Sequence, residues 1–308
     1  MTTDVSEKNK AAGRSIAANP VALLLVTGFL VGLNFPLGKL AGAAEVSPTL
    51  WAALLSLGVC LLLGPILWLK KRLSFSGKQM VRYVVISAII SFIIPNLLLF
   101  TVIPHTGSGY AGLMFALSPV FTLTLAGIFR LKTPGFLGML GIATGLAGAA
   151  LVSFTRGGEE NAPDLIWLIA ALLVPMTLAC GNIYRTIDWP AGAQPDALAF
   201  WSHGFSLLVY AVLLFAEFGS IPLASLAAIP LVALGQLIVG GLTFPVFFRL
   251  QQKGGPVLLS QLGYVAAAVS LVAATLLLGE SYAMLTWIGA AVIAVGIGIT
   301  VLAQIREN

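Results

Sequence analysis

Ten apolar segments, each about as long as a membrane-spanning helix, dominate this sequence of 308 residues. A helix needs about 20 apolar residues to cross the hydrocarbon core of a bilayer. The segments cover residues 20–42, 47–69, 81–103, 107–129, 134–154, 164–186, 197–218, 229–250, 257–278 and 282–303. Only 9% of the residues are charged, whereas a soluble domain carries about 25%. We therefore predict an all-α integral membrane protein with ten transmembrane helices.

The direction of the segments follows from the basic residues, since Lys and Arg near the ends of spans stay cytoplasmic. With the N-terminus inside, 14 of the 16 basic residues fall on the cytoplasmic side, and Lys39 and Arg156 fall outside. We expect a multi-pass protein of the cell inner (plasma) membrane with both termini cytoplasmic and residues 1–19 as a polar tail. The net charge of +5 then reflects orientation in the membrane, and no nucleic-acid partner is expected.

The chain divides into two five-helix halves, residues 20–154 and 164–303. Because five is an odd number of spans, the second half must be inverted relative to the first, which is a common plan in transporters. A weak internal repeat at offsets near 150 residues supports this division. The matched positions are Gly138 with Gly289, Ala143 with Ala294, Gly145 with Gly296, Pro95 with Pro245, Gly127 with Gly279, and Asn34 with Asn182.

Glycines at helical spacing in the fifth and tenth segments predict close helix packing. Small residues three or four apart let two backbones approach each other. The first set is Gly138, Gly141, Gly145 and Gly148, and the looser second set is Gly289, Gly296 and Gly298. We assign these glycines a packing role and no ligand.

Three stretches resemble the EamA family of the drug/metabolite transporter superfamily. The first is Gly32-Leu-Asn-Phe-Pro-Leu-Gly-Lys39, followed by Val46-Ser-Pro48. The second is Ala116-Leu-Ser-Pro-Val-Phe-Thr-Leu123, and the third runs from Gly254-Gly-Pro-Val-Leu-Leu-Ser260 to Leu278-Gly-Glu280. The resemblance implies a ten-helix exporter of small metabolites, often amino acids or related compounds, with a cavity between two inverted halves. The chain departs from the family pattern where Leu55 replaces a frequent Arg.

Polar side chains inside the apolar segments are candidates for function, because they are costly at membrane depth without partners. The candidate substrate-binding residues are Asn34, Asn96, Ser118, Asn182, Gln236, Gln261 and Tyr264. Each has an alternative role as a hydrogen-bonding link between helices, worth ~0.6–2 kcal/mol. Amides supply both donors and acceptors, which suits a zwitterion or an amide-bearing solute. We predict that Asn34, Asn96, Asn182 and Gln261 line one cavity.

Four further residues are candidates for gating or coupling: Pro36, Lys39, Pro119 and His203. A proline frees a helix carbonyl one turn back, and such a carbonyl is tolerated at depth where it lines a cavity; a plain kink is the alternative. Lys39 either snorkels to the outer interface or attracts a carboxylate at the outer mouth. His203 either titrates and couples transport to protons, or is simply hydrogen-bonded.

The sequence has no Asp or Glu in the middle of any apolar segment. A midplane carboxylate is the usual means of proton coupling, so we expect facilitated diffusion or exchange. The paired aspartates that hold magnesium and diphosphate, and the P-loop of ATPases, are also missing from the sequence. Cys60 and Cys180, without a histidine pair, make no metal site. We predict no enzyme activity, no metal and no cofactor.

These observations together predict a secondary transporter or facilitator that exports small polar metabolites by alternating access. The partners expected are a small-molecule substrate and membrane lipid, with the chain as a monomer or weak dimer. The alternative is a membrane receptor or accessory subunit without transport. The loops are only about ten residues long at most, which argues against a sensor.

Overall fold

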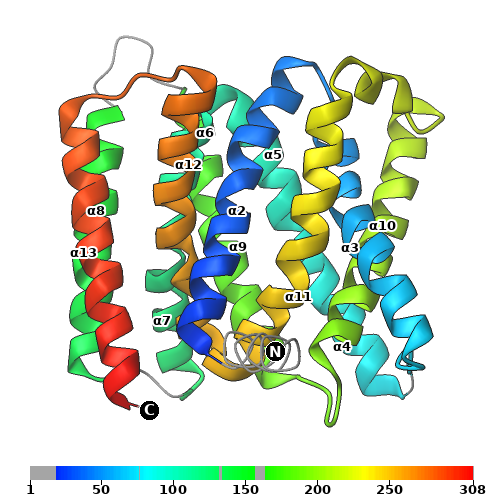
Figure 1. The fold of residues 1–308 in the computed structure, drawn as a ribbon, viewed down its shortest axis with the longest axis horizontal. Coiled ribbons are helices and arrows are strands. Elements are labelled where there is room, and N and C mark those ends of the chain that lie inside the picture. Colours follow the sequence, from blue (N-terminus) through cyan, green and yellow to red (C-terminus); the bar gives the residue numbers. More distant parts are fainter. Residues whose placement is uncertain (1–18, 76, 132–133, 157–163, 308) are drawn as a thin grey trace, which may run out of the picture.

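The computed structural model describes residues 19–75, 77–131, 134–156 and 164–307. Every regular element within these ranges is a helix, which confirms the expected all-α class. Figure 1 shows the helices standing side by side between an upper and a lower face of the molecule. The first turn of α2 and the last turn of α13 lie at the lower face (Figure 1).

The helices follow one another along the chain with short connections. The α-helices are α2 (Pro20–Ala43), α3 (Pro48–Leu69), α4 (Lys78–Ala88), α5 (Ile94–Thr106), α6 (Ser108–Phe115), α7 (Ser118–Ile128), α8 (Phe136–Arg156), α9 (Leu165–Ile187), α10 (Pro195–Phe218), α11 (Pro230–Ser260), α12 (Leu262–Leu278) and α13 (Met284–Glu307). A π-helix, η1 (Ile89–Ile93), joins α4 to α5, and a 3-10 helix, η2 (Leu223–Ala228), precedes α11.

Seven helical runs of the described chain are long and apolar enough to cross a membrane. Two of them are composite: α4, η1 and α5 form one run of 29 residues, and α6 and α7 form one of 21. Three shorter apolar stretches lie in α8, α12 and α13. Each of the ten apolar segments expected from the sequence overlaps one of these helices. The chain is therefore a multi-pass helical membrane protein, while the number of crossings stays a prediction.

Proline and small polar caps fix where the first helices begin. Pro20 and Pro48 occupy the first helical position, where a missing N–H costs nothing. The preceding residues supply the caps: Asn19 Oδ1 accepts from the Val21 amide at 2.9 Å, and Ser47 Oγ accepts from the Leu50 amide at 3.1 Å.

Glycine and proline also set the breaks between consecutive helices. Gly107, between α5 and α6, has φ of 85°, and Gly255, near the end of α11, has φ of 68°. Both values lie in the left-handed region, which glycine reaches without strain. Gly255 kinks α11, and the residues after the kink form the last helical turns of α11 before α12 begins. The π-helical turn of η1 ends two residues before Pro95, whose ring disturbs the helix one turn earlier.

The two sequence halves interleave in the packed structure. α2 packs against α11 and α12, and α9 packs against α5 and α7. α3 packs against α10, α6 against α12, and α8 against α13. Most helix contacts of the core therefore join one half of the chain to the other.

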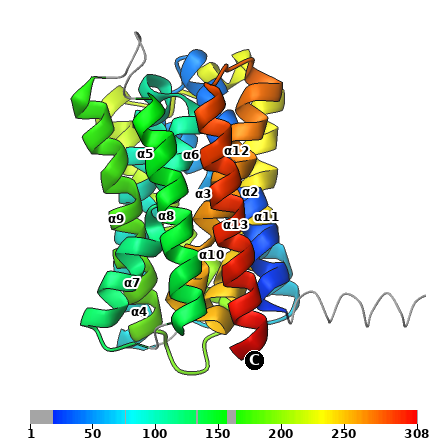
Figure 2. The ribbon, with the colours of Figure 1, turned by 90° about the vertical axis from the view of Figure 1, so that its left-hand side faces the viewer.

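The pair α8 and α13 is held close by glycine, as the sequence predicts (Figure 2). A Cβ added at Gly148 would lie 2.6 Å from the Gly289 carbonyl oxygen, and one at Gly296 would lie 2.6 Å from the Gly145 amide nitrogen. Both distances are too short for any side chain, so these glycines are packing residues. Gly298 differs, because its added Cβ would meet no atom within 4 Å.

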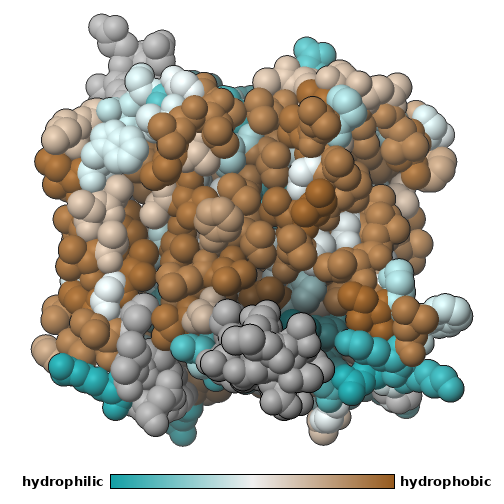
Figure 3. All heavy atoms as spheres, in the orientation of Figure 1, coloured by the Kyte–Doolittle hydropathy of each residue, from teal (hydrophilic) through white to brown (hydrophobic). Residues whose placement is uncertain are grey.

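An apolar belt surrounds the molecule between its two faces. Large apolar side chains such as Phe136, Leu231 and Leu277 are exposed on it. Figure 3 shows this brown belt, with hydrophilic residues gathered along the lower edge. Exposed apolar surface of this extent is what a chain presents to lipid.

Candidate functional site

Arg185, in the last turn of α9, is buried in the protein with 1% of its surface exposed. Its Nη2 donates to Asn182 Oδ1 at 2.7 Å and to Gln251 Oε1 at 3.1 Å, and its Nε donates to the same Gln251 oxygen at 3.3 Å. Among the residues that the structure describes, none accepts a hydrogen bond from Nη1, and no carboxylate forms an ion pair with this guanidinium. A buried charge without a counter-ion is costly, and the acceptors of these hydrogen bonds from Arg185 are both neutral amide oxygens.

Neighbouring amides and hydroxyls complete this arrangement. Gln251 Nε2 donates to Thr186 Oγ1 at 2.6 Å and to the Asn182 carbonyl at 3.1 Å. Asn182, Arg185 and Thr186 share one face of α9 because they are three and four residues apart. Asn182 Nδ2 also reaches Thr122 Oγ1 of α7 at 3.5 Å. We call these five residues the Arg185 network; it joins α9 and α11 to a helix of the first half.

Two phenyl rings pack against the guanidinium. The Arg185 Cζ lies 4.9 Å from the ring centroid of Phe247 and 5.5 Å from that of Phe92. Phe247 and Gln251 are one turn apart on α11, so the helix presents a ring and an amide to the same charge. Cation–π contact stabilises the guanidinium partly, and it does not use the N–H groups that donate to Asn182 and Gln251.

His203 of α10 lies in the aromatic cluster next to this network. Its Nδ1 is 3.0 Å from Ser56 Oγ of α3, and its ring centroid lies 3.9 Å from Phe244 and 4.4 Å from Phe92. The residue is fully buried, and Nε2 has no partner among the described residues. The histidine is therefore hydrogen-bonded, as one of the two expected roles requires, with one ring nitrogen left over.

An ion pair between Arg82 and Asp188 lies at the lower face beside the network. Arg82 of α4 donates to both carboxylate oxygens of Asp188, through Nε at 3.0 Å and through Nη2, and the Tyr184 hydroxyl donates to Oδ2 at 2.6 Å. The hydrogen bonds from Arg82 hold the pKa of the Asp188 carboxyl below its ordinary value, with Tyr184 acting in the same direction. Asp188 is thus already committed to Arg82 and does not neutralise Arg185.

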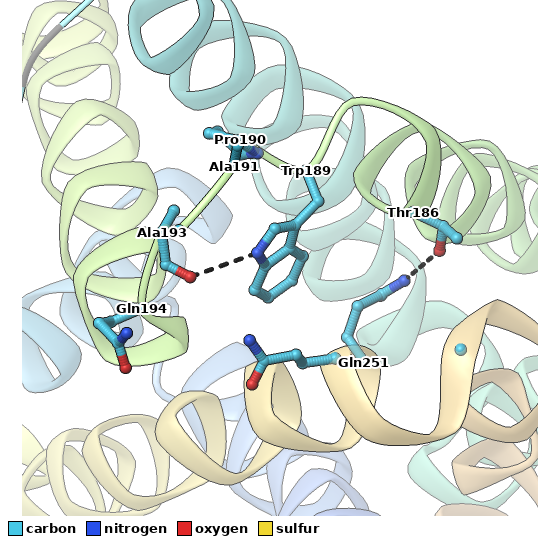
Figure 4. Close-up of a pocket in the computed structure, with 10 residues that line it drawn as sticks. Thr186, Trp189, Pro190, Ala191, Ala193, Gln194 and Gln251 are labelled. Atoms are coloured by element: carbon cyan, nitrogen blue, oxygen red, sulfur yellow. Dashed lines mark hydrogen bonds between the residues drawn. The ribbon is translucent and has the colours of Figure 1, made fainter.

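A pocket of about 410 Å³ opens at the lower face between the α9–α10 connection and the end of α11. Its wall includes Thr186, Trp189, Gln194, Gln251 and the backbone of Gly255. Figure 4 shows Gln251 reaching from α11 to Thr186 beside the Trp189 ring, whose Nε1 donates to the Ala193 carbonyl at 3.3 Å. Thr186 and Gln251 belong both to this wall and to the Arg185 network, so the pocket adjoins the buried charge.

A second pocket, of about 260 Å³, lies at the opposite end of α2, between α2, α3 and α5. Its wall includes Glu45, Trp51 and His105. Lys39 is half-buried near this pocket, and its Nζ donates to the Pro104 carbonyl at 3.2 Å. The lysine therefore satisfies a carbonyl at the end of α5 in this conformation.

The predicted amides are buried or half-buried, and most retain a polar atom without a partner among the described residues. Asn34 Nδ2 donates to the Leu30 carbonyl at 3.1 Å, which leaves Oδ1 unpaired. Both side-chain polar atoms of Gln236, Nδ2 of Asn96 and Oε1 of Gln261 are unpaired as well. Asn182 differs, because both its polar atoms belong to the Arg185 network. One cavity for all these amides stays a prediction.

The remaining predicted residues lie at helix breaks or in packing contacts. Ser118 and Pro119 are buried at the start of α7, where Pro119 ends the preceding helical register. Pro36 is buried inside α2. The Tyr264 hydroxyl donates to the Ile142 carbonyl of α8 at 3.2 Å, so it is occupied within the protein in this conformation.

Comparison with known proteins finds a family that the first part of the chain resembles. Residues 19–154 match the EamA-like transporter family. That match confirms the resemblance for the first two sequence motifs, which lie within residues 19–154, whereas the third motif, at residues 254–280, lies outside it.

Curated relatives and one solved structure are also similar to this chain. The chain is 26% identical over 201 residues to the uncharacterized inner membrane transporter YedA of Escherichia coli strain K12, and to YedA of strains O6:H1 and O157:H7. The alignment covers 64% of this chain and 63% of each relative, so it spans less than two thirds of their length. A crystal structure described only as "Crystal structure of protein" superposes with a TM-score of 0.67 at 17% identity, over 92% of this chain and 99% of that one. It shows the same fold.

Sequence reasoning missed two central residues of this site, Arg185 and Gln251. Arg185 is one of the 14 bases that set the membrane orientation, and nothing in that count separates it from exposed bases. A signal is present, because Asn182 and Thr186 lie within one turn of it on a helix whose other polar positions are few. Gln251 falls just beyond the eighth apolar segment and resembles a loop residue in the sequence.

Proposed function

We propose that this EamA-like protein is a secondary transporter or facilitator that exports small polar metabolites, such as amino acids or related compounds, across the inner membrane. The observation that carries the proposal is the Arg185 network, a buried polar cluster between the two halves of the chain that adjoins a pocket at one face. Buried, incompletely paired polar groups inside a bundle of membrane helices are typical of solute pathways.

Alternating access by two inverted five-helix halves, in ten crossings, is the mechanism we propose. In that arrangement α2 corresponds to α9. The run of α4 and α5 corresponds to α11, and the run of α6 and α7 corresponds to α12. α2 packs on α11 and α12, and α9 packs on their counterparts α5 and α7, so the two sets of contacts are equivalent. Helices that would be exchanged by a two-fold axis, such as α3 with α10 and α8 with α13, pack directly on each other. These contacts support the inverted repeat.

The lower face is cytoplasmic in this proposal, and both termini lie there. Described bases at that face include Lys70, Arg82 and Arg249, and basic residues near span ends stay inside. The protein acts as a monomer or weak dimer with lipid around its apolar belt. Transport runs down the substrate gradient by facilitated diffusion or exchange, because the apolar segments carry no midplane carboxylate.

A transport assay with purified protein tests the proposal. Cells that overproduce the protein are first screened for tolerance to toxic levels of individual amino acids and their relatives. The protein is then reconstituted, and liposomes loaded with an unlabelled solute from the screen are given the labelled solute outside. We expect accumulation by exchange that protein-free liposomes lack. A folded, inserted protein that exchanges no member of the panel would instead favour a receptor or accessory subunit.

A further inference from the structure

We propose that Arg185 is the binding site for the carboxylate group of the transported solute, so that the substrate class is the monocarboxylates with an apolar body. This inference rests on the proposed function and deepens it. It begins from the charge of the site: the guanidinium is buried, and the described carboxylate nearest in sequence, Asp188, is bound by Arg82 and Tyr184. A single anionic group would supply the missing counter-ion.

The hydrogen-bonding edge of Arg185 has the shape that a carboxylate needs. A guanidinium binds a carboxylate through two parallel N–H donors. Here Nε and Nη2 both converge on one oxygen, Gln251 Oε1, at 3.3 and 3.1 Å. The glutamine amide therefore occupies the position of one carboxylate oxygen, and Nη1 donates to no described residue.

Gln251 also provides the route by which a solute reaches this edge. Its side chain forms part of the wall of the 410 Å³ pocket at the lower face. It is held there by Nε2, which donates to Thr186 Oγ1 and to the Asn182 carbonyl. Rotation of this one side chain would connect the pocket with Arg185 and release Nε and one N–H of Nη2 to the incoming anion, while the other N–H of Nη2 still donates to Asn182.

The surroundings of the charge select an apolar body for the solute. Phe92 and Phe247 lie against the guanidinium, and Phe244 and Phe248 extend the same cluster. The hydrogen bonds of Arg185 go to Asn182 and Gln251, which carry no charge. One positive charge beside several phenyl rings suits one carboxylate on an aliphatic or aromatic body better than a dianion.

Binding to the purified protein tests the inference without any transport measurement. The probes are acid and amide pairs of equal shape: phenylacetate with phenylacetamide, and N-acetylleucine with N-acetylleucinamide. We expect the acids to raise the melting temperature of the protein in detergent in a saturable manner, and the amides at equal concentration to have no effect. Equal responses to acid and amide in both pairs, or no response to either acid, would overturn the inference.

Three variants assign the effect to Arg185. Arg185→Lys keeps the charge and loses the paired donors, so we expect the half-saturating concentration of phenylacetate to rise about tenfold or more. Lys70→Gln is the matched control, since it removes an exposed base from the same face and should bind phenylacetate as the wild type does. Gln251→Glu places an internal carboxylate beside Arg185, and we expect it to abolish the response to phenylacetate without lowering the melting temperature of the free protein.

The two proposals fail in different ways. Normal phenylacetate binding by Gln251→Glu and Arg185→Lys would show that Arg185 does not bind the carboxylate, whatever the result of the transport assay. If liposomes exchange acids and amides at equal rates, the proposed transporter function holds and the proposed carboxylate site is refuted. Acid-specific binding that needs Arg185, without exchange of any bound acid, would keep the site and refute the transporter.

Discussion

Replacing Gly58 with Ala should force α3 away from α11 and destabilise the protein. An added Cβ at Gly58 would lie 2.1 Å from the carbonyl oxygen of Leu237 and 2.9 Å from its carbonyl carbon. Ordinary contact begins near 3.4 Å, so the two backbones would have to separate by about 1.3 Å, the difference between 3.4 and 2.1 Å. The atoms in the way belong to a helix backbone, which cannot rotate aside as a side chain can.

The expected size of the effect combines two opposing contributions. Overpacking costs ~1–3 kcal/mol, and the better helix propensity of Ala returns ~0.5–1 kcal/mol relative to Gly. Because the contact is with backbone, we take the upper part of the first range and expect a net loss of about 2 kcal/mol in the free energy of unfolding. Since α3 and α11 belong to different halves, we also expect slower exchange in liposomes.

Gly204→Ala is the matched control for this variant. Gly204 lies inside α10, and an added Cβ there would meet no atom within 4 Å. We expect this substitution to stabilise the helix by ~0.5–1 kcal/mol. Both variants are unfolded in the same detergent by heat and by denaturant titration. If Gly58→Ala proves as stable as Gly204→Ala, the two helices do not approach each other as described and the reasoning fails.

Three further predictions concern orientation, pH and coupling. In a variant without native cysteines, Ser220→Cys should react with an impermeant maleimide on spheroplasts and Ala191→Cys should not; the reverse pattern would invert the topology. The folded-state pKa of Asp188 is lowered chiefly by Arg82, so its contribution to stability is present above the unfolded value of about 3.9 and is lost as pH falls through the folded pKa. The stability difference between wild type and Asp188→Asn should therefore be constant at neutral pH and shrink in acid; a difference independent of pH down to acid unfolding would contradict this. His203→Gln should leave exchange and its small response to a pH gradient unchanged, whereas loss of gradient-driven accumulation would identify His203 as a coupling residue.

Much of the fold could be predicted because membrane-spanning helices are local structures. A run of about 20 apolar residues satisfies its own backbone hydrogen bonds in lipid, so its extent can be found without knowing its neighbours. Gly141, Gly145 and Gly148 could be assigned to packing for the same reason, since their spacing defines one helix face. Gly298 shows the limit of this argument, because whether a face has a partner depends on where the next helix lies.

The candidate site divides in the same way. The sequence by itself determined that polar residues such as Asn182 and His203 would be buried within apolar helices, since their neighbours along the chain are apolar. Only the tertiary structure decided that Arg185 would be buried among Gln251, Phe92 and Phe247, and not exposed at the membrane surface like most of the other bases. The physical reason is that charge and hydropathy are properties of single residues and of short segments. Whether a charge is buried, and which groups lie beside it, depends on helices that are far apart in the sequence and meet only in the folded protein.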